Sequence, residues 1–316
     1  MLAGGLGSRM RPLTDNCPKP LLPLGAEPLV AYQLRRLAAV GVGQVVLATG
    51  YLAPEFERVL GDGQRWGVRL GYSVERQPLG TGGALRAAGE HLPDADRVVV
   101  VNGDLLSSHD LTAQLRSAPG ADVCLHVRAV PDVAPYGQVT CDAKGRVTAF
   151  GEKTGRGPGL ANAGTNIVAG AVLRALREGR SSWERDLLPA LIAGDTDVVA
   201  WEGDGYFRDV GSCEAYRRAS VDAVTGALPN GSCSAADAYV APGASVAADA
   251  RLTGGSSIHE GAVVGSGAVV CGSVVLAGAR IGAGARLDRC VVASGAVVPA
   301  GGVGTDDVIG GIPTLR

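Results

Sequence analysis

The chain has 316 residues, and its 29 lysines and arginines nearly balance 31 aspartates and glutamates. This length allows one large or two medium domains, and the balanced charge argues against a dedicated nucleic-acid or membrane-surface binder. No apolar run approaches the roughly 20 residues of a membrane span. The seven scattered cysteines form no Cys-x-x-Cys pair, so we expect neither a zinc site nor a disulfide framework, and we predict a cytoplasmic protein.

A glycine-rich loop at residues 4–8 is followed by Arg9, Arg11 and, ten residues after Arg9, by Lys19. Glycines let backbone N–H groups approach a phosphate closely, the cations supply full charges, and a helix after the loop would add its positive end. The spacing lacks the third glycine of a dinucleotide fingerprint and the Gly-Lys-Ser/Thr of a Walker loop. We predict a triphosphate site; the alternative is a tight turn with a solvated arginine.

The first hundred residues alternate between helical and strand patterns. We predict helices at 28–41, 54–60 and 85–92, and strands at 45–50, 68–74 and 97–101. Such alternation indicates an α/β sheet with parallel strands. Ligands of such sheets bind at the carboxyl ends of the strands, where the glycine loop and the next two motifs lie.

Two motifs follow predicted strands in this region. Gly80-Thr81-Gly82-Gly83 permits close backbone approach to a base or ribose, although it could be an ordinary flexible turn. Asn102-Gly103-Asp104 places a carboxylate directly after a buried valine strand, where a bare charge is costly. Mg²⁺ would satisfy Asp104, because it binds one or two carboxylates together with substrate phosphates. The alternative is a turn-forming Asn-Gly-Asp.

The middle of the chain reads as strands at 121–127, 137–141, 147–150 and 198–201, with a helix at 183–192. Asp209 follows a strand and repeats the logic of Asp104, although it could instead cap a helix at 212–221. Taken alone, Glu152-Lys153 is a solvated ion pair and Asn162 a turn former.

After about Ala236 the composition shifts to glycine, alanine and valine, and aliphatic residues recur every six positions. They stand at Val240, Val246, Leu252, Ile258, Val264 and Val270 and, after one slip, at Ile281 and Leu287. This repeat is typical of a left-handed parallel β-helix, in which each hexapeptide forms one flat side. We predict roughly three coils between Val240 and Val298. An exposed flat face and an open end favour pairing with a second copy.

The N-terminal stretch resembles the signature of the sugar-1-phosphate nucleotidyltransferases. That family carries Gly-Gly-x-Gly-x-Arg-x-x-Pro-Leu-Thr and then Pro-Lys-Pro, and every named position is kept from Gly4 to Pro20. The resemblance implies a Rossmann-like mixed-sheet nucleotidyltransferase domain at residues 1–230, followed by a β-helix domain at 236–310. It implies transfer of a nucleoside monophosphate from a nucleoside triphosphate to a sugar 1-phosphate, with release of pyrophosphate and Mg²⁺ as cofactor.

The resemblance also assigns roles to individual residues. The catalytic set would be Arg9, Lys19, Asp104 and Asp209, of which the two aspartates bind the metal. The nucleotide would contact Leu2, Gly4, Gly5, Gly7, Ser8, Gly80, Thr81 and Asn102. The sugar phosphate would contact Gly137, Glu152, Lys153 and Asn162. The sequence Pro78-Leu-Gly-Thr-Gly-Gly83 is most like mannose- or heptose-1-phosphate guanylyltransferases and favours GTP.

Two departures and two alternatives accompany this interpretation. Thr154 replaces the family's usual proline after Glu-Lys, which leaves the loop and the sugar's identity open. Family members carry more apolar residues before the glycine loop, so the true start could lie upstream of Met1. A hexapeptide acyltransferase with His259 as base is one alternative. A non-catalytic paralogue that binds nucleotide sugars is the other.

Overall fold

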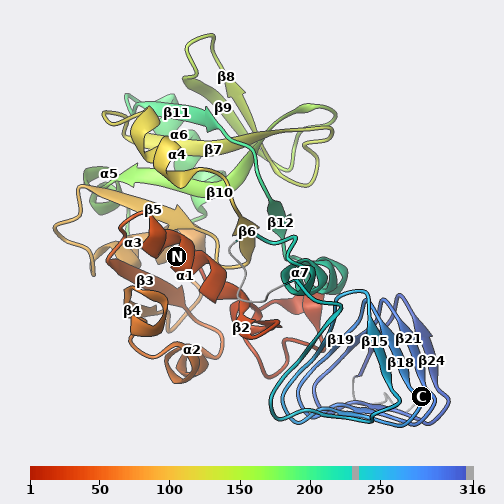
Figure 1. Ribbon diagram of the computed structural model, residues 1–316. Coiled ribbons are helices and arrows are strands. Elements are labelled where there is room, and N and C mark those ends of the chain that lie inside the picture. The colour runs from red at the N-terminus through yellow and green to blue at the C-terminus, as the bar shows by residue number, and fades with distance from the viewer. Residues whose placement is uncertain (230–234, 311–316) are drawn as a thin grey trace. The chain divides into compact units, whose positions relative to one another are not determined.

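The computed structural model describes residues 1–229 and 235–310 (Figure 1). The chain divides into two compact units. One contains Met1–Gly5 and Gln33–Phe207, and the other contains Leu6–Tyr32 and Arg208–Arg316. The N-terminal glycine loop therefore starts in the first unit and continues in the second. Residue 230, where we predict the first domain to end, lies outside the described residues.

The first unit is built on a mixed β-sheet. Its strands are β3 (Gln44–Thr49), β4 (Arg69–Val74), β5 (Arg97–Val101), β6 (Leu105–Ser107), β7 (Val123–Val130), β8 (Gly137–Cys141), β9 (Val147–Glu152), β10 (Gly159–Ala169) and β11 (Val198–Glu202). Six of them form a sheet in the order β11-β7-β10-β8-β9, with β5 also beside β10. β11 runs parallel to β7, whereas β10 is antiparallel to β5, β7 and β8.

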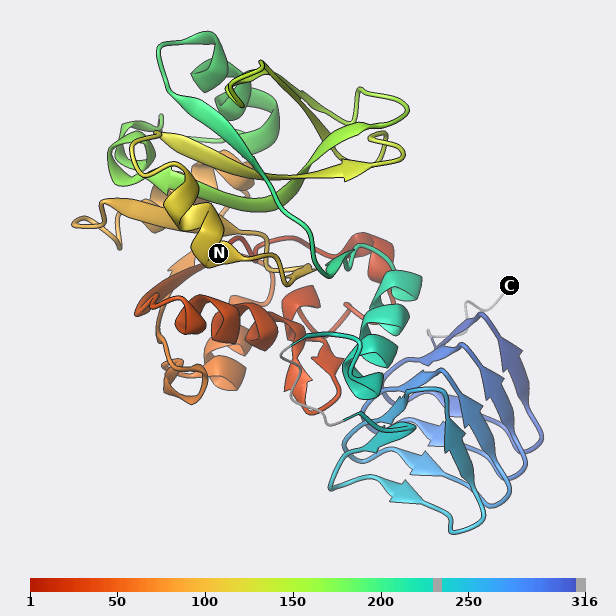
Figure 2. The same cartoon turned by 45° about the horizontal axis from the view of Figure 1, so that its top comes forward.

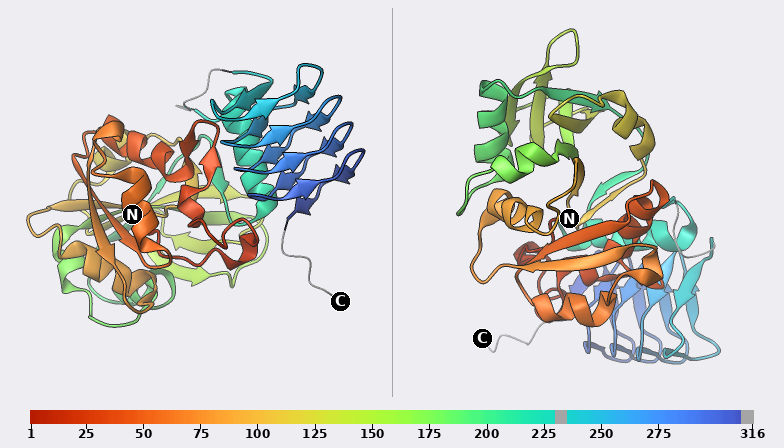
Figure 3. Two further views of the ribbon diagram at one scale, coloured as in Figure 1. Left: turned by 90° about the horizontal axis from the view of Figure 1, so that it is seen from below. Right: turned by 90° about the vertical axis from the view of Figure 1, so that its left-hand side faces the viewer.

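The parallel arrangement predicted for the first hundred residues is confirmed. β3 pairs in parallel with β4, as Figure 3 shows. Leu2 forms parallel bridges to both Ala48 and Asn102. The Leu2 N–H donates to Val101 O at 2.9 Å, and the Ala3 N–H donates to Ala48 O at 2.9 Å. The N-terminal residues thus join β3 to β5.

The helices follow the predicted pattern with one difference. They are α1 (Leu29–Ala39), α2 (Ala53–Leu60), α3 (Gly80–Gly89), α4 (Leu111–Ser117), α5 (Gly170–Ala175), α6 (Leu188–Ala193), which follows a π-helical turn at Trp183–Leu187, and α7 (Cys213–Thr225). α3 begins at Gly80, five residues before the predicted start, so the glycine motif forms its first turn. A Cβ at Gly82 would lie 2.6 Å from Leu187 Cδ1. Glycine therefore allows α3 to pack closely against that segment.

The core of the first unit lies between the sheet and the helices on one of its faces. Leu85 of α3, Leu173 of α5 and Trp183 pack against strand residues such as Val123 and Leu125. Trp183 and Leu125 are almost completely buried. Burying a side chain of this size stabilises the fold by about 1.5–3 kcal/mol. The alternating valine and leucine residues of these strands thus decide which sheet face is covered.

The second unit contains the short strands β1 (Pro23–Leu24) and β2 (Glu27–Pro28), the helix α7 and a parallel β-helix (Figure 2). β13 (Ala238–Val240), β16 (Ser256–Ile258), β19 (Val274–Val275), β22 (Val291–Val292) and β25 (Val308–Ile309) form one wall of the β-helix. β14 (Ser245–Val246), β17 (Val263–Val264), β20 (Arg280–Ile281) and β23 (Val297–Val298) form the second. β15 (Arg251–Thr253), β18 (Val269–Cys271), β21 (Arg286–Asp288) and β24 (Val303–Thr305) form the third.

These three walls give four complete coils rather than the predicted three. Ile258, Val275, Val292 and Ile309 stack in register at intervals of 17 residues. The single slip predicted after Val270 therefore recurs in every later coil, at the same corner. Gly272, Arg289 and Asp306 occupy that corner with φ of 52°, 52° and 51°. One left-handed residue turns the corner in five residues instead of six.

Two simple expectations can be compared with the described residues. Among them, no helix is long and apolar enough to cross a membrane. The six described cysteines are all free thiols, which agrees with the expected lack of a disulfide framework in that part of the chain. Cys233 lies outside the described residues.

Candidate active site

Leu2, Asn102 and Asp104 lie together at the carboxyl end of β5 in the first unit. The Gly103 N–H donates to Leu2 O at 2.8 Å. A Cβ at Gly103 would lie only 2.9 Å from that oxygen, so the close approach requires glycine. Asp104 is half-buried directly after this contact. The backbone thus fixes Asp104 next to the N-terminal residues that lead into the glycine loop.

Asn102 also connects to β10, which carries a residue predicted to bind the sugar. The Asn102 N–H donates to Gly164 O at 3.2 Å, and the Gly164 N–H donates to Asn162 Oδ1 at 3.3 Å. Gly164 has a φ of 66°, and the pairing of β10 with β7 is irregular between Asn162 and Asn166. This irregularity brings the predicted nucleotide residue Asn102 and the predicted sugar residue Asn162 to the same place.

The other three residues predicted to bind the sugar phosphate lie on the neighbouring strands β8 and β9. Gly137 stands opposite Glu152 in the antiparallel register. Lys153 Nζ lies 3.3 Å from Glu152 Oε1, and the Lys153 side chain is 53% exposed. Lys153 has a φ of 58°, and its N–H donates to Tyr136 O at 3.0 Å. A half-exposed ammonium group held at the end of a strand is well placed to bind an anion.

The predicted base-contacting residues Gly80 and Thr81 have a structural role within the first unit. The Thr81 hydroxyl donates to Glu184 Oε2 at 2.7 Å and accepts from the Trp183 N–H at 2.8 Å. A Cβ at Gly80 would lie 2.4 Å from Ser181 O. Packing of α3 therefore accounts for these residues without a ligand, and their contact with a nucleotide stays a prediction.

The glycine loop passes from Gly4 and Gly5 in the first unit to Gly7 and Ser8 in the second. The space around a Cβ at Gly5 is open to beyond 4 Å. Gly7 has a φ of 62°, and the Thr14 hydroxyl donates to its carbonyl oxygen at 2.9 Å. A single 3-10 turn follows at Ser8–Met10 in place of the helix we considered. Anion binding here would rest on the loop N–H groups and Arg9 rather than on a helix dipole.

Arg9 and Asp209 lie beside each other in the second unit, although 200 positions separate them in the sequence. A Cβ at Gly211 would lie 3.3 Å from Asp209 Oδ1 and 3.4 Å from Arg9 Nη2. Asp209 ends β12 (Phe207–Asp209). The cap of α7 is Ser212, whose Oγ accepts from the Ala215 N–H at 3.1 Å. The alternative role of Asp209 as a helix cap is therefore wrong.

Lys19 begins a 3-10 turn at Lys19–Leu21 in the second unit. Pro18 and Pro20 on either side of it are buried, which anchors the backbone as the Pro-Lys-Pro pattern predicts. The structure thus assembles the predicted site in two groups. Lys19 belongs with Arg9 and Asp209, while Asp104 belongs with Asn102, Asn162 and Lys153. The meeting of the two groups in one pocket stays a prediction.

The donor set for Mg²⁺ can be judged from the carboxylates. Within residues 1–229 and 235–310, no group of three or more His, Cys, Asp and Glu side chains could by itself hold a metal ion. This fits Mg²⁺, which keeps several waters and takes one or two carboxylates together with substrate phosphates. Asp104 and Asp209, each after a strand, provide carboxylates of that kind.

Sequence reasoning missed a buried polar cluster behind Asp104. His109 and His126 have ring centroids 3.5 Å apart, and Arg36 Nη2 lies 2.8 Å from His109 Nε2. Burial, and then the Arg36 guanidinium, lower the pKa of His109 to about 2. The Gln33 amide donates to Leu105 O. These histidines seem scattered in sequence because their nearness depends on the pairing of distant strands.

His259, the base of the acyltransferase alternative, lies in the β-helix and is only 5% exposed. Burial lowers its pKa to about 4, and its ring lies 5.9 Å from that of Tyr239. A ring enclosed in this way cannot reach an acyl donor in solvent. The geometry of the second unit therefore gives no support to acyl transfer.

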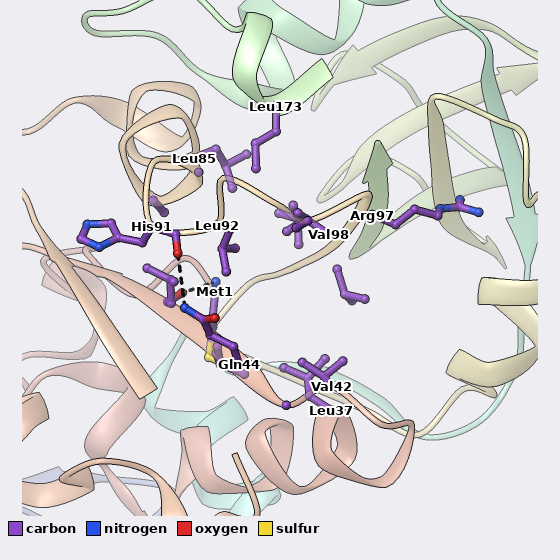
Figure 4. A pocket seen from close by; sticks show the side chains of 18 of the residues that line it. Met1, Leu37, Val42, Gln44, Leu85, His91, Leu92, Arg97, Val98 and Leu173 are labelled. Carbon is purple, nitrogen blue, oxygen red and sulfur yellow. Dashed lines mark hydrogen bonds between the residues drawn. The ribbon is translucent and has the colours of Figure 1, made fainter. Parts of the chain in front are cut away.

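A cavity of about 460 Å³ lies in the first unit between β3, β5 and α3 (Figure 4). Its lining includes Gln44, Leu85, Val98 and Leu173. The amine of Met1 is buried against it and donates to Val46 O at 2.8 Å, and burial lowers its pKa to about 5. The cavity lies at the amino ends of β3 and β5, so it is separate from the Asn102 and Asp104 side of the sheet.

Comparison with known proteins gives the same division of the chain in functional terms. The nucleotidyl transferase family model matches residues 1–225. A model described as the GlmU-like C-terminal hexapeptide matches residues 226–308. The stacked short parallel strands are those of a left-handed β-helix, as predicted.

Among curated proteins, a mannose-1-phosphate guanylyltransferase of Mycobacterium tuberculosis is 39% identical over 73% of this chain and 65% of its own length. The chain thus spans just under two thirds of that relative. A D-glycero-alpha-D-manno-heptose 1-phosphate guanylyltransferase of Aneurinibacillus thermoaerophilus is 34% identical over 69% of this chain and 95% of its own length.

A crystal structure of HddC from Yersinia pseudotuberculosis complexed with GMP-PN is 29% identical. It has a TM-score of 0.61 and covers 69% of this chain and 96% of that chain. The family model matches well over half of the described sequence and includes every residue predicted for the site. The chain therefore belongs to the nucleotidyl transferase family.

Proposed function

We propose that this protein transfers a guanylyl group from GTP to a sugar 1-phosphate and releases pyrophosphate. The observation that carries the proposal is the similarity to guanylyltransferases over the segment that contains the predicted site. The related structure in complex with GMP-PN supports a guanine nucleotide in particular. The geometry around Asn102, Asn162 and Lys153 supports a second, anionic substrate beside the first.

The reaction needs positioning and charge neutralisation more than proton transfer. A phosphate oxygen of the sugar 1-phosphate attacks the α-phosphorus, and the bond from that phosphorus to the bridging oxygen breaks. The electron pair leaves with pyrophosphate. The attacking phosphate is already an anion near neutral pH, so a general base is unnecessary. Rate enhancement then comes from alignment of the reactants and stabilisation of charge.

Each charged side chain has a task in this scheme. Arg9 would neutralise the departing pyrophosphate, Lys19 the α-phosphate, and Lys153 the phosphate of the sugar. Glu152 and Asn162 would bond sugar hydroxyls, and the backbone at Gly137 would leave room for them. Asp104 and Asp209 would hold Mg²⁺, which when bound neutralises phosphate charge and aligns the two substrates.

A panel of substrates tests the proposal. The four common ribonucleoside triphosphates and dTTP are each paired with mannose, heptose and glucose 1-phosphates, and pyrophosphate release is measured with and without Mg²⁺. We expect the highest kcat/KM with GTP and a mannose- or heptose-type phosphate. A protein that turns over none of these pairs with Mg²⁺, yet binds a GDP-sugar, would instead be the non-catalytic paralogue.

We also propose that the enzyme is cytosolic and forms a homodimer or larger homo-oligomer through the β-helix. Val297 and Val303, on adjacent walls of the last coils, are 64% and 75% exposed. Exposed apolar side chains on a regular strand surface favour pairing with a second copy. Light scattering after size exclusion would give the mass. A double change of Val297 and Val303 to lysine should shift it toward the monomer.

A further inference from the structure

α7 lies between the segment that contains Arg9 and the β-helix, all within the second unit. On the side of the Arg9 segment, the Tyr216 hydroxyl donates to Pro23 O at 2.7 Å, and the Cys213 thiol donates to Met10 O at 3.7 Å. Tyr216 is fully buried. The start of α7 is therefore tied to the same short segment that presents Arg9 and Lys19.

The other side of α7 packs directly on the first wall of the β-helix. Ser220 Oγ and Ser257 Oγ share a hydrogen bond of 2.9 Å, and both residues are fully buried. A Cβ at Gly255 would lie 2.9 Å from Val221 Cγ1 and 2.9 Å from Thr225 Cγ2. Only glycine at this position, which also has a φ of 75°, permits such close packing.

Arg217 is the charged group at this contact. Its side chain is only 8% exposed. Its Nη1 donates to Gly272 O at 2.9 Å, while its Nε and Nη2 donate to the two carboxylate oxygens of Glu214 at 2.9 and 3.0 Å. The Arg217 guanidinium lowers the pKa of Glu214. A buried guanidinium is costly unless its donors are satisfied, so its partners hold α7 in one position against the β-helix corner at Gly272.

The position of α7 in turn determines where Asp209 lies. Arg208 Nη2 is 2.8 Å from Asp222 Oδ2 on α7, and Val210 is fully buried. Asp209 is held between these two anchored neighbours. Its Oδ1 borders Gly211 together with Arg9 Nη2.

We propose that Arg217 is a positioning residue. By locking α7 onto the β-helix, it holds Asp209 and Arg9 in the arrangement that guanylyl transfer requires. The β-helix is then a working support for the active site as well as an assembly module. This inference rests on the proposed function, because its effect on catalysis passes through Asp209 and Arg9.

The test compares Arg217→Met with Arg218→Met in the full-length protein. Arg218 is the matched control, because it bonds the same Glu214 at 2.6 Å but has a side chain that is 61% exposed. We expect Arg217→Met to lower kcat at least tenfold and to raise the Mg²⁺ concentration for half-maximal rate several-fold. The KM for the sugar 1-phosphate should change less than twofold, because Lys153 and Asn162 belong to the other unit. Arg218→Met should keep kcat within twofold of the wild type.

A second readout does not depend on turnover. Hydrogen exchange should become faster in residues 209–225 and around Gly272 in Arg217→Met, and should stay unchanged in β7 and β10. If Arg217→Met does not fold, Arg217→Lys replaces it, since lysine can reach Gly272 O but cannot bond both Glu214 oxygens; we expect a smaller change of the same kind.

Three results separate the possible failures. Normal kcat and Mg²⁺ dependence in Arg217→Met would overturn the positioning role. An equal loss in both methionine variants would overturn it too, because the exposed arginine would then matter as much. A wild-type protein without turnover on the substrate panel would sink the proposed function instead, while faster exchange in Arg217→Met would still establish the mechanical link.

Discussion

The mixed sheet of the first unit and the β-helix of the second use irregular backbone in opposite ways. In the sheet, irregular positions occur singly and coincide with predicted substrate contacts. Examples are Lys153 with a φ of 58°, Gly164 with a φ of 66° and the pairing shift between Asn162 and Asn166. In the β-helix, the left-handed corner residue recurs every 17 residues. An isolated irregularity therefore marks a candidate site, whereas a repeated one is part of the architecture.

The largest expected effect comes from an isolated site residue. Asp104→Asn should lower turnover by about 100-fold or more, because it removes the negative charge proposed to hold Mg²⁺. The melting temperature should hardly change. Asp94→Asn, at an exposed aspartate of the same unit, is the control and should keep normal turnover. Pyrophosphate release by Asp104→Asn at a near-normal rate would remove Asp104 from the site.

Matched core substitutions sharpen the comparison next. Leu125→Ala in β7 and Leu287→Ala in β21 should each cost about 2–5 kcal/mol of unfolding free energy, because both side chains are almost fully buried. Coils of a solenoid contact only their neighbours. Leu287 lies beyond the coils that touch α7, so its variant should keep turnover within twofold at 25 °C, as urea titration and rate assays would show. Equal losses of activity in both variants would contradict this division.

The third expectation concerns the cavity at the amino ends of β3 and β5. An extension of four apolar residues before Met1 should raise stability by about 2 kcal/mol at pH 7. It would replace the buried amine by a peptide group and would place apolar side chains against Val45, Leu85 and Val98. Four serines serve as the control. Equal melting temperatures for the two extended proteins would show that the cavity does not accept a strand.

The smallest effect is a pH dependence within the β-helix. Burial lowers the pKa of His259 from 6.5 to about 4, so between these values the unfolded chain binds a proton that the native protein does not. Stability should therefore fall as the pH falls through this window, by about 1 kcal/mol at pH 5.5 from this residue. Urea titrations from pH 7.5 to 5 should show a shallower decline for His259→Gln. An unchanged slope would rule out the contribution of His259.

Much of the fold could be predicted because each element has a local signal. The apolar run of β5 and the hexapeptide aliphatic positions of the β-helix report their own burial. The extra coil was missed because the five-residue corner hides Val275 and Val292 from a strict count of six. The early start of α3 at Gly80 was missed because glycine reads as a loop, whereas here it fits the helix against Leu187.

The candidate site was predictable only in part. The glycine loop and Asp104 carry short motifs, and the resemblance supplied Lys153 and Asn162. The nearness of Arg9 to Asp209 and the clustering of His109 with His126 depend on pairing between distant segments. No local pattern encodes such contacts. Arg217 has no sequence signal either, because an arginine on a helix is normally exposed.

The 17-residue spacing of the β-helix has a consequence for how its length can change. Because each later coil repeats the register of the one before, the loss or duplication of 17 residues would restore every inward aliphatic to an inward position. Insertions of any other size would turn valines outward and polar side chains inward. Length variants of this tail should therefore differ from one another by whole coils.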